Sequence, residues 1–252
     1  MARRIMLTLF LVVAAFVAGA QNALAGGGSF LTFPALLLAG MGARAANITS
    51  TVALFPGQLA SGFTGRAQVR GTAALSLRAL AAISLVGGAI GAALLLETPE
   101  RFFERLVPFL VLFATAVFAW GSFFRKGGEG HVALGKWPAA CVQFLISIYG
   151  GYFGGGIGML MLAALTLAGL PVRNAGATKN VLAGVMNASA VLVFVFSPDV
   201  HWVPAAAVCV GALAGGQVGA WMLKWVNERA LRVVVVGIGA ALTVGLFLKA
   251  YG

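Results

Sequence analysis

The chain has 252 residues, of which 61% are hydrophobic and 9% are charged, and its formal net charge is +11. A mean hydropathy of +0.99 excludes an ordinary soluble domain, and the recurring apolar runs predict an all-α polytopic membrane protein. Most lysines and arginines stand at the ends of these runs, where they orient a membrane protein. They therefore do not indicate nucleic-acid binding.

Ten apolar segments follow one another along the chain. The first five are 5–25, 29–41, 46–65, 75–96 and 102–124, and the second five are 137–153, 157–170, 175–196, 202–224 and 230–250. Short connections join them and leave no stretch for a soluble enzyme domain. The first segment also resembles a cleavable signal peptide. We expect it to be kept, because 137–153 takes the same place in the second half.

The two halves repeat one pattern. Residues 26–34 read GGGSFLTFP and residues 154–159 read GGGIGM, and each run leads through an apolar stretch to an arginine. The glycine triplets are 128 residues apart (154 − 26), and Arg44 and Arg173 are 129 apart (173 − 44). Gly-Gly pairs at 87–88 and 215–216 keep the offset of 128. The pattern predicts two transmembrane repeats, 1–126 and 127–252.

The distribution of basic residues favours an inverted arrangement of these repeats. Five crossings per repeat, an odd number, would invert the second repeat relative to the first, and ten crossings in total place both termini on one side. With that side outside, 11 of the 17 basic residues fall inside and 6 outside. Were the two short segments re-entrant hairpins, the halves would run parallel and the count would be 9 to 8. The first division fits the positive-inside rule better.

The two short segments differ from the others in length. Segment 29–41 makes roughly 20 Å of helix, against roughly 30 Å of hydrocarbon, and segment 157–170 is barely longer. Each is expected to begin from its glycine triplet at mid-membrane depth, where irregular backbone must be buried in protein or line a cavity. The alternative is that the glycines only allow close helix packing, which fits the pairs at 87–88 and 215–216. Three adjacent glycines favour a broken helix.

A helix that starts at a glycine triplet offers unpaired N–H groups and the positive end of its dipole, which together bind anions. Ser29 would either cap its helix or contact a ligand. Gln58 and Asn187 match at the offset of 129 and would either contact a ligand or hydrogen-bond across helices. Lys179, at the position that matches Ser50, would select anions if it faces a cavity, or would extend outward to the interface. The predicted substrate-binding residues are Gly27, Gly28, Ser29, Asn47, Thr49, Ser50, Gln58, Gly155, Gly156, Thr178, Lys179, Asn180 and Asn187.

These motifs resemble those of the TauE/SafE sulfite exporter family. The first is GGGSFLTFP followed by GMGARAANITS, and the second is GGYFGGGIGM followed by LPVRNAGATKN. The resemblance covers nearly the whole chain and implies a permease of the bacterial inner membrane that moves sulfite, sulfonates or related small sulfur-containing anions. The chain departs from the family where members commonly read Gly-Thr-Ser. It has Asn-Ile-Thr-Ser in the first half and Ala-Thr-Lys-Asn in the second.

The sequence thus predicts a secondary transporter of a small anion that works by alternating access. An anion channel, an organic-acid permease and a membrane assembly subunit without transport remain as alternatives. The sequence predicts no enzyme activity, catalytic residue, metal or cofactor, because no cluster of His, Cys and carboxylates is available. The expected partners are the anion and the lipid bilayer; a homodimer is also compatible.

Overall fold

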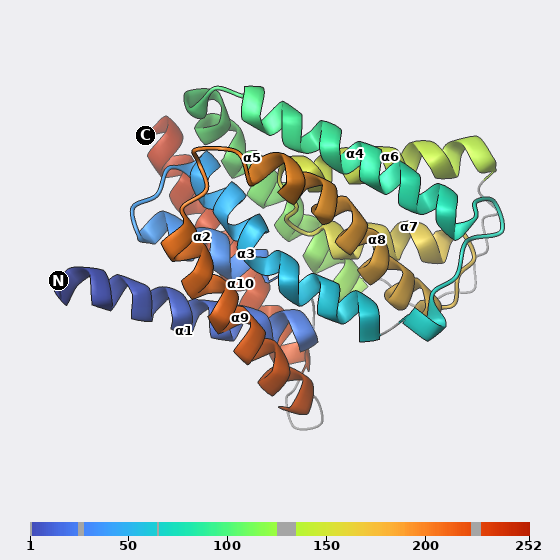
Figure 1. Ribbon diagram of the computed structural model, residues 1–252, viewed down its shortest axis with the longest axis horizontal. Coiled ribbons are helices and arrows are strands. Elements are labelled where there is room, and N and C mark those ends of the chain that lie inside the picture. Colours follow the sequence, from blue (N-terminus) through green and yellow to red (C-terminus); the bar gives the residue numbers. More distant parts are fainter. Residues whose placement is uncertain (1, 25–27, 65, 125–134, 223–227) are drawn as a thin grey trace.

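The computed structural model describes residues 2–24, 28–64, 66–124, 135–222 and 228–252, and these ranges contain ten α-helices and no β-strand (Figure 1). The helices are α1 (Ala2–Leu24), α2 (Ser29–Leu38), α3 (Ala43–Thr64), α4 (Leu77–Glu97), α5 (Glu100–Ala119), α6 (Lys136–Tyr152), α7 (Ile157–Leu167), α8 (Val172–Phe194), α9 (Trp202–Met222) and α10 (Glu228–Tyr251). A 3₁₀ turn, Arg66–Gln68, follows α3, and a π-helical turn, Trp120–Phe124, ends α5. The all-α class and the ten predicted segments are confirmed, whereas the two extra turns were not foreseen.

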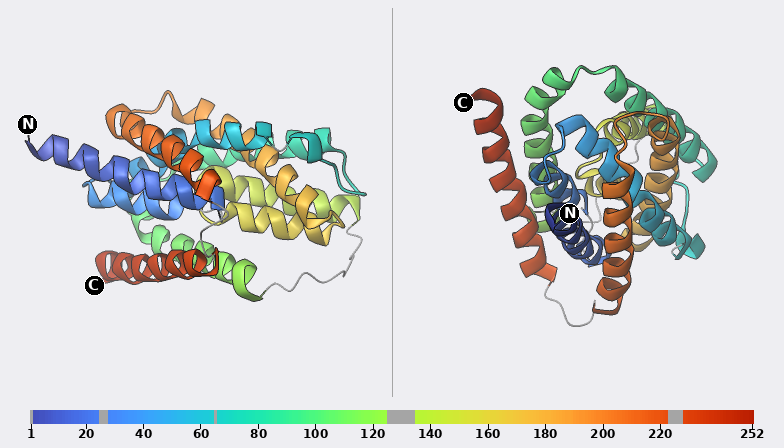
Figure 2. Two further views of the ribbon diagram at one scale, coloured as in Figure 1. Left: turned by 90° about the horizontal axis from the view of Figure 1, so that it is seen from below. Right: turned by 60° about the vertical axis from the view of Figure 1, so that its left-hand side comes forward.

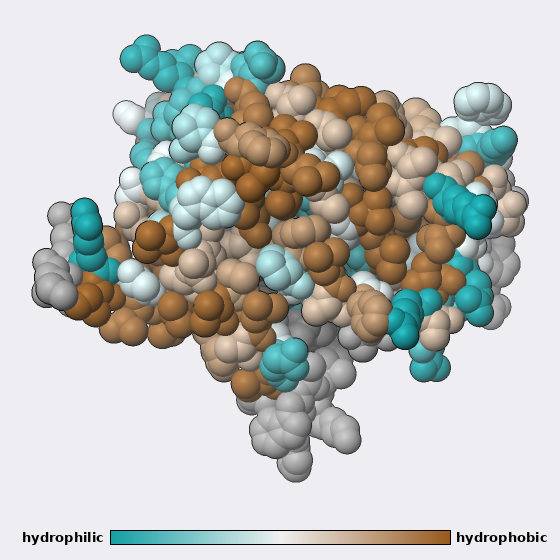
Figure 3. Space-filling model, viewed as in Figure 1, coloured by the Kyte–Doolittle hydropathy of each residue, from teal (hydrophilic) through white to brown (hydrophobic). Residues whose placement is uncertain are grey.

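Six of the helices are long and apolar enough to cross a membrane, namely α1, α4, α5, α8, α9 and α10. In contrast, α2 has 10 residues and α7 has 11, which gives each of them roughly half the length that a bilayer core requires. Apolar side chains cover the middle of the visible surface, and hydrophilic side chains gather toward its two ends (Figure 3). The chain is a multi-pass membrane protein.

The two ends of the helical bundle differ in charge. One end, called the acid end here, carries the carboxylates Glu97, Glu100, Glu104 and Asp199 together with the basic residues Arg44, Arg101, Arg105 and Lys249. The other, the basic end, carries Arg66, Arg70, Arg78, Lys136 and Arg173. No carboxylate whose side chain the structure describes lies at the basic end. Both chain termini lie toward the left of Figure 1, and the Tyr251 hydroxyl donates a hydrogen bond to the Arg105 carbonyl at the acid end.

Two close helix pairs join the halves of the chain. In α9, Gly211 and Gly215 pack against the backbone of Val12 and Phe16 in α1, so these two helices run parallel, from the acid end to the basic end. In α4, Gly87 and Gly91 likewise pack against α6, and this pair runs from the basic end to the acid end. A methyl group at Gly215 or Gly91 would collide with a backbone carbonyl, so packing accounts for these glycines. The opposite directions favour the inverted repeat, which stays a prediction.

The remaining helices complete the bundle around a central pair. Helices α3 and α8 contact each other. Each also contacts a helix of the opposite half, since α3 contacts α9 and α8 contacts α4. Helices α5 and α10 lie side by side along one flank (Figure 2). Of the short helices, α2 contacts α1, α3 and α10, and α7 contacts α5, α6 and α8, so each has neighbours from both halves.

Candidate functional site

The second glycine triplet forms the turn from which α7 starts. Gly154 and Gly156 have φ angles of +78° and +71°, in the left-handed region that favours glycine. The Tyr149 hydroxyl donates a hydrogen bond of 2.7 Å to the Gly155 carbonyl. No described residue accepts a hydrogen bond from the N–H of Gly155 or Gly156. The start of α7 therefore presents open donors at the positive end of a helix dipole.

The first triplet gives α2 a different start. Gly26 and Gly27 lie outside the described residues, so the predicted role of Gly27 has no structural description. Gly28 has an ordinary right-handed φ of −53°, and its N–H donates to Asn22 Oδ1 of α1 at 3.3 Å. The Asn22 side chain thus accepts a hydrogen bond from a backbone N–H at the start of α2, whereas the corresponding N–H groups at the start of α7 have no acceptor among the described residues.

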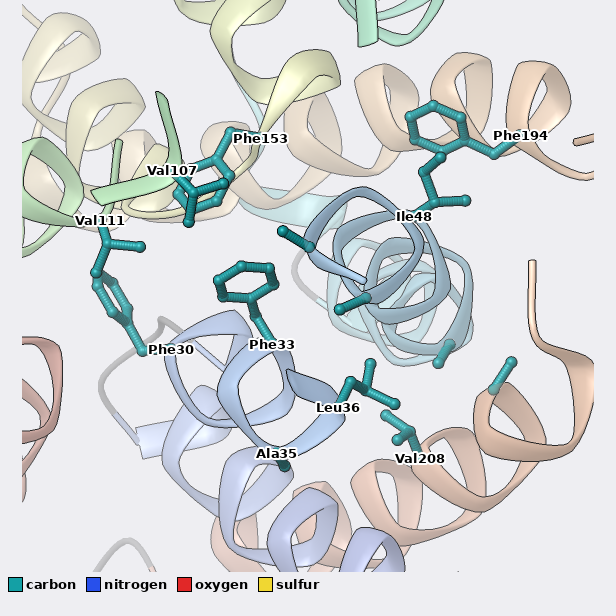
Figure 4. Packing of buried hydrophobic residues seen from close by; sticks show 14 of the residues in the cluster. Phe30, Phe33, Ala35, Leu36, Ile48, Val107, Val111, Phe153, Phe194 and Val208 are labelled. Carbon is teal, nitrogen blue, oxygen red and sulfur yellow. The ribbon is translucent and has the colours of Figure 1, made fainter. Parts of the chain in front are cut away.

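A cavity lies between the two starts. It is small, with a volume of about 20 Å³, and it is lined by Ser29, Phe30, Phe33, Pro34, Asn47, Val111, Phe153, Gly155 and Leu242. Phe33 and Phe153 meet edge to face with their ring centroids 5.7 Å apart, and Figure 4 shows Phe30 and Phe33 directed toward Val111 and Phe153. The walls are mainly apolar and aromatic. The cavity brings together three predicted residues, Ser29, Asn47 and Gly155.

The two polar side chains of the cavity have different surroundings. Ser29 is the first residue of α2, and no side chain caps this helix at Gly28. Of the two alternatives for Ser29, the cap is therefore not observed; Ser29 lines the cavity, and its ligand contact stays a prediction. The Asn47 side chain donates through Nδ2 to the Tyr152 carbonyl at 3.0 Å. Since Tyr152 is the last residue of α6, Asn47 ties α3 to the backbone that leads into the second triplet.

Lys179 of α8 lies beside the first turn of α7. Its Nζ is 3.4 Å from the position that a Cβ on Gly158 would take, so the glycine makes room for the ammonium group. Lys179 is partly buried, and no described residue pairs with its ammonium. Lys179 does not itself line the cavity, but its amine lies beside the start of α7. The neighbouring Asn180 is also partly buried.

Two predicted threonines hold connections between helices. Thr178 Oγ1 donates to the Arg70 carbonyl at 2.9 Å and accepts from the Arg70 N–H at 3.0 Å. Thr49 Oγ1 donates to the Asp199 carbonyl at 3.4 Å and accepts from the His201 N–H at 3.2 Å. Both hydroxyls are buried and occupied by backbone groups of the opposite half. A ligand contact for either threonine stays a prediction.

Three further predicted residues bond to side chains of other helices. Ser50 Oγ and Thr32 Oγ1 are 2.7 Å apart, which ties α3 to α2. Asn187 Nδ2 donates to Gln58 Oε1 at 2.6 Å, which ties α8 to α3. For these two amides the interhelical alternative is the one observed. Their ligand contact stays a prediction.

Sequence reasoning missed the residues that hold the site in place. Tyr149 lies about one turn before the second triplet and bonds to it. Its position in the sequence is a weak signal, because a tyrosine in an apolar helix is common and has no fixed role. Arg44, which the sequence marked only as part of the repeat, forms ion pairs with Asp199 at 2.9 Å and Glu100 at 3.5 Å. Arg44 and Asp199 are 155 residues apart in the chain, so no local pattern relates them.

The polar groups around the cavity are suited to binding a ligand. The described residues contain no group of three or more His, Cys, Asp or Glu side chains that would hold a metal ion. Around the cavity the polar groups are N–H donors, one hydroxyl, one amide and a nearby ammonium. They match the charge of an anion and provide no nucleophile beside a base.

The described residues thus form a multi-pass helical bundle with a small cavity between the starts of α2 and α7. Residues 11–246 match the sulfite exporter TauE/SafE family model, and the chain belongs to that family.

The chain is similar to a probable membrane transporter protein of Haemophilus influenzae, with 29% identity over 88% of this chain and 87% of the relative. It is also 32% identical to the probable membrane transporter protein ORF9 of a Sinorhizobium species, over 95% of this chain and 92% of the relative. A third relative, the probable membrane transporter protein YfcA of Escherichia coli K12, is 26% identical over 94% of this chain and 88% of its own. No solved structure gives a significant match. The membrane transporter class and the family resemblance are thus confirmed.

Proposed function

We propose that the chain is a secondary transporter, a permease or exporter, for sulfite or a related organosulfur anion, and that it works by alternating access. One observation supports this above others. At the start of α7, the N–H groups of Gly155 and Gly156 and the Lys179 ammonium have no partner among the described residues, and Gly155 lines the same cavity as Ser29. A fixed positive field at the wall of a cavity selects anions.

The walls of the cavity bear on the kind of anion. Phe33, Phe153 and Val111 would contact an apolar group, whereas Ser29 and Asn47 would bond to oxygen atoms. We expect the anionic group to lie toward the α7 start and any organic part to lie toward the aromatic rings. A small sulfonate satisfies both surfaces, and sulfite satisfies the polar one.

Alternating access would follow from the two repeats, 1–126 and 127–252, if one rocks against the other. The opposite directions of the α1–α9 and α6–α4 pairs support such a movement, because they give each half the same packing in inverted orientation. The predicted location is the bacterial inner membrane, with the basic end at the cytoplasm as the positive-inside rule requires. No cofactor is proposed, and the oligomeric state is left open.

Uptake by proteoliposomes tests the proposal. Purified protein is reconstituted, and the entry of ³⁵S-labelled sulfite and ethanesulfonate is measured for the wild type, Lys179→Gln and the exposed acid-end control Lys249→Gln. We expect saturable flux for the wild type and the control, and a raised KM for Lys179→Gln. Absence of sulfite and sulfonate flux, or an unchanged KM in Lys179→Gln, would contradict the proposal or the role of this lysine, respectively.

Counterflow separates a carrier from a channel. A carrier loaded with unlabelled anion inside the vesicles takes up labelled anion faster, because the loaded site returns in exchange, whereas a channel shows no such stimulation. Uptake of small carboxylates in place of sulfur anions would favour an organic-acid permease. A membrane assembly subunit would give no flux with any anion.

A further inference from the structure

Arg44 joins three helix connections at the acid end. Its Nε donates to Asp199 Oδ2 at 2.9 Å, in the connection between α8 and α9. Its Nη1 donates to the Thr98 carbonyl at 2.8 Å, between α4 and α5. Its own backbone N–H donates to Glu100 Oε1 at 3.1 Å, where α3 begins. One side chain thus holds connections from both halves of the chain.

These contacts continue inward to the cavity. Asn47 lines the cavity and lies three residues from Arg44 on α3, so about one helical turn separates the ion pair from the cavity wall. Asn47 is bonded to the Tyr152 carbonyl, and the Tyr152 hydroxyl lies 3.2 Å from Thr98 Oγ1. A connected set of polar contacts therefore lies between the cavity and the acid end.

The basic end is closed by contacts of another kind. Arg173 Nε donates to Gln68 Oε1 at 3.0 Å, and Asn174 Nδ2 donates to the Gln68 carbonyl at 2.8 Å. Thr178 bonds to the backbone of Arg70. Among the side chains that the structure describes at this end, none supplies a negative charge.

The difference occurs at matched positions of the repeat. At the offset of 129, Arg173 corresponds to Arg44, and Asp199 corresponds to Arg70. The first half thus contributes an arginine that meets an aspartate, whereas the second half contributes an arginine whose matched partner is a second arginine. An ion pair between opposite charges therefore connects the helices at the acid end. At the basic end the matched residues are two arginines, and hydrogen bonds to neutral groups make the connections.

We propose that the Arg44–Asp199 ion pair is the lock of the acid end and that the basic end, which lacks this pair, opens first and receives the anion between Arg70 and Arg173. The inference rests on the proposed transport function, because an ion pair can hold one end closed only in a protein whose two ends open during transport. In the resting protein the acid end is closed. Opening of this end follows only when movement of α3 or of the α8–α9 connection separates the two charges.

Electron–electron distance measurements between paired spin labels test the lock without any transport assay. Cys141 and Cys209 are first replaced by alanine, and cysteines are introduced in pairs at exposed positions. The acid-end pair is Leu38→Cys with Phe196→Cys, and the basic-end pair is Ala67→Cys with Val172→Cys; all four side chains are exposed. Each pair is measured in lipid nanodiscs for the wild type, Asp199→Asn and the control Arg101→Gln, an exposed charge at the same end.

Asp199→Asn removes the charge but keeps the size of the side chain. We expect the ratio of long to short acid-end distances to rise about tenfold, as the loss of a charge-assisted hydrogen bond predicts. The control should stay at the wild-type ratio. Basic-end distances that retain the wild-type short component show that the variant is folded. An acid-end distribution that stays at the wild-type ratio in Asp199→Asn would overturn the lock.

Arg70→Asp provides the reciprocal test, because it places a carboxylate at the position that matches Asp199. We expect it to shift the basic-end pair toward short distances and to slow anion release and uptake at that end. An unchanged basic-end distribution would overturn the inferred asymmetry. Failure of the proposed function is distinguishable from either result. In that case wild-type proteoliposomes carry no anion, whatever the spin-label distances show.

Discussion

The starts of α2 and α7 come from the same sequence pattern and differ in chemistry. At α2, Gly28 has right-handed backbone geometry and its N–H is bonded to Asn22. At α7, Gly154 and Gly156 are left-handed, Tyr149 holds the Gly155 carbonyl, and Lys179 lies beside the first turn. The repeated motif thus marks two corresponding helix starts, while the residues around each copy decide which start leaves N–H donors without a partner among the described residues.

The largest expected effect is at Gly156. A residue with a Cβ costs about 1–2 kcal/mol in the left-handed region, and a Cβ at Gly156 would lie 3.0 Å from the Ala114 carbonyl oxygen. We expect Gly156→Ala to lower the initial rate of anion uptake by at least about tenfold, since about 1.4 kcal/mol corresponds to that factor. Gly28→Ala is the matched comparison. Its φ of −53° suits alanine, and a Cβ there would lie 3.2 Å from the Ala18 carbonyl oxygen, so the two variants differ mainly in backbone conformation. A fall in uptake as large as that of Gly156→Ala would remove the distinction between the two starts.

The next effect concerns charge. Lys179 and Ser50 occupy matched positions, but Ser50 is bonded to Thr32 whereas the Lys179 ammonium has no partner among the described residues. We expect Lys179→Gln to raise the KM for the anion about tenfold, in the range of a charge-assisted hydrogen bond. Ser50→Ala should lower the thermal stability of the protein and change the KM less. Equal changes in KM for the two variants would argue against a special role of α7.

The sequence predicted the framework of this comparison more fully than its chemistry. Ten helices, the short lengths of α2 and α7, and the packing role of Gly87 and Gly215 follow from hydropathy and glycine spacing, which are local properties. The cavity could be foreseen only as a meeting of two helix starts. The role of Asn22 at α2 could not be read from spacing, because any polar side chain on α1 would serve. Contacts such as Asn47 with Tyr152 join segments 105 residues apart, and only the packed fold decides them.

A smaller effect is expected at Tyr149, the residue that orients the second triplet. Tyr149→Phe removes one hydrogen bond to the Gly155 carbonyl, worth about 1 kcal/mol, and leaves the ring contacts with Phe113 and Phe153. We expect the KM for the anion to rise about fivefold while the maximal rate changes less, because the N–H donors of the triplet lose their fixed direction. Tyr251→Phe, which removes a hydroxyl at the acid end, is the control. A fall in thermal stability without a change in KM would restrict Tyr149 to a packing role.

The smallest effect tests the place where the halves meet. Gln58 and Asn187 match at the offset of 129 and bond to each other, and two matched positions touch only if they lie near the axis that relates the repeats. Each amide alone would be left without its partner, so Gln58→Leu and Asn187→Leu should each destabilise the fold, and the double variant should cost less than their sum. We expect a coupling of about 0.6 kcal/mol, as interhelical hydrogen bonds in membranes give, measured from unfolding free energies in bicelles. If the losses of unfolding free energy are additive and either single variant raises the KM, the amides would instead contact the anion. Part of the binding site would then lie at the axis.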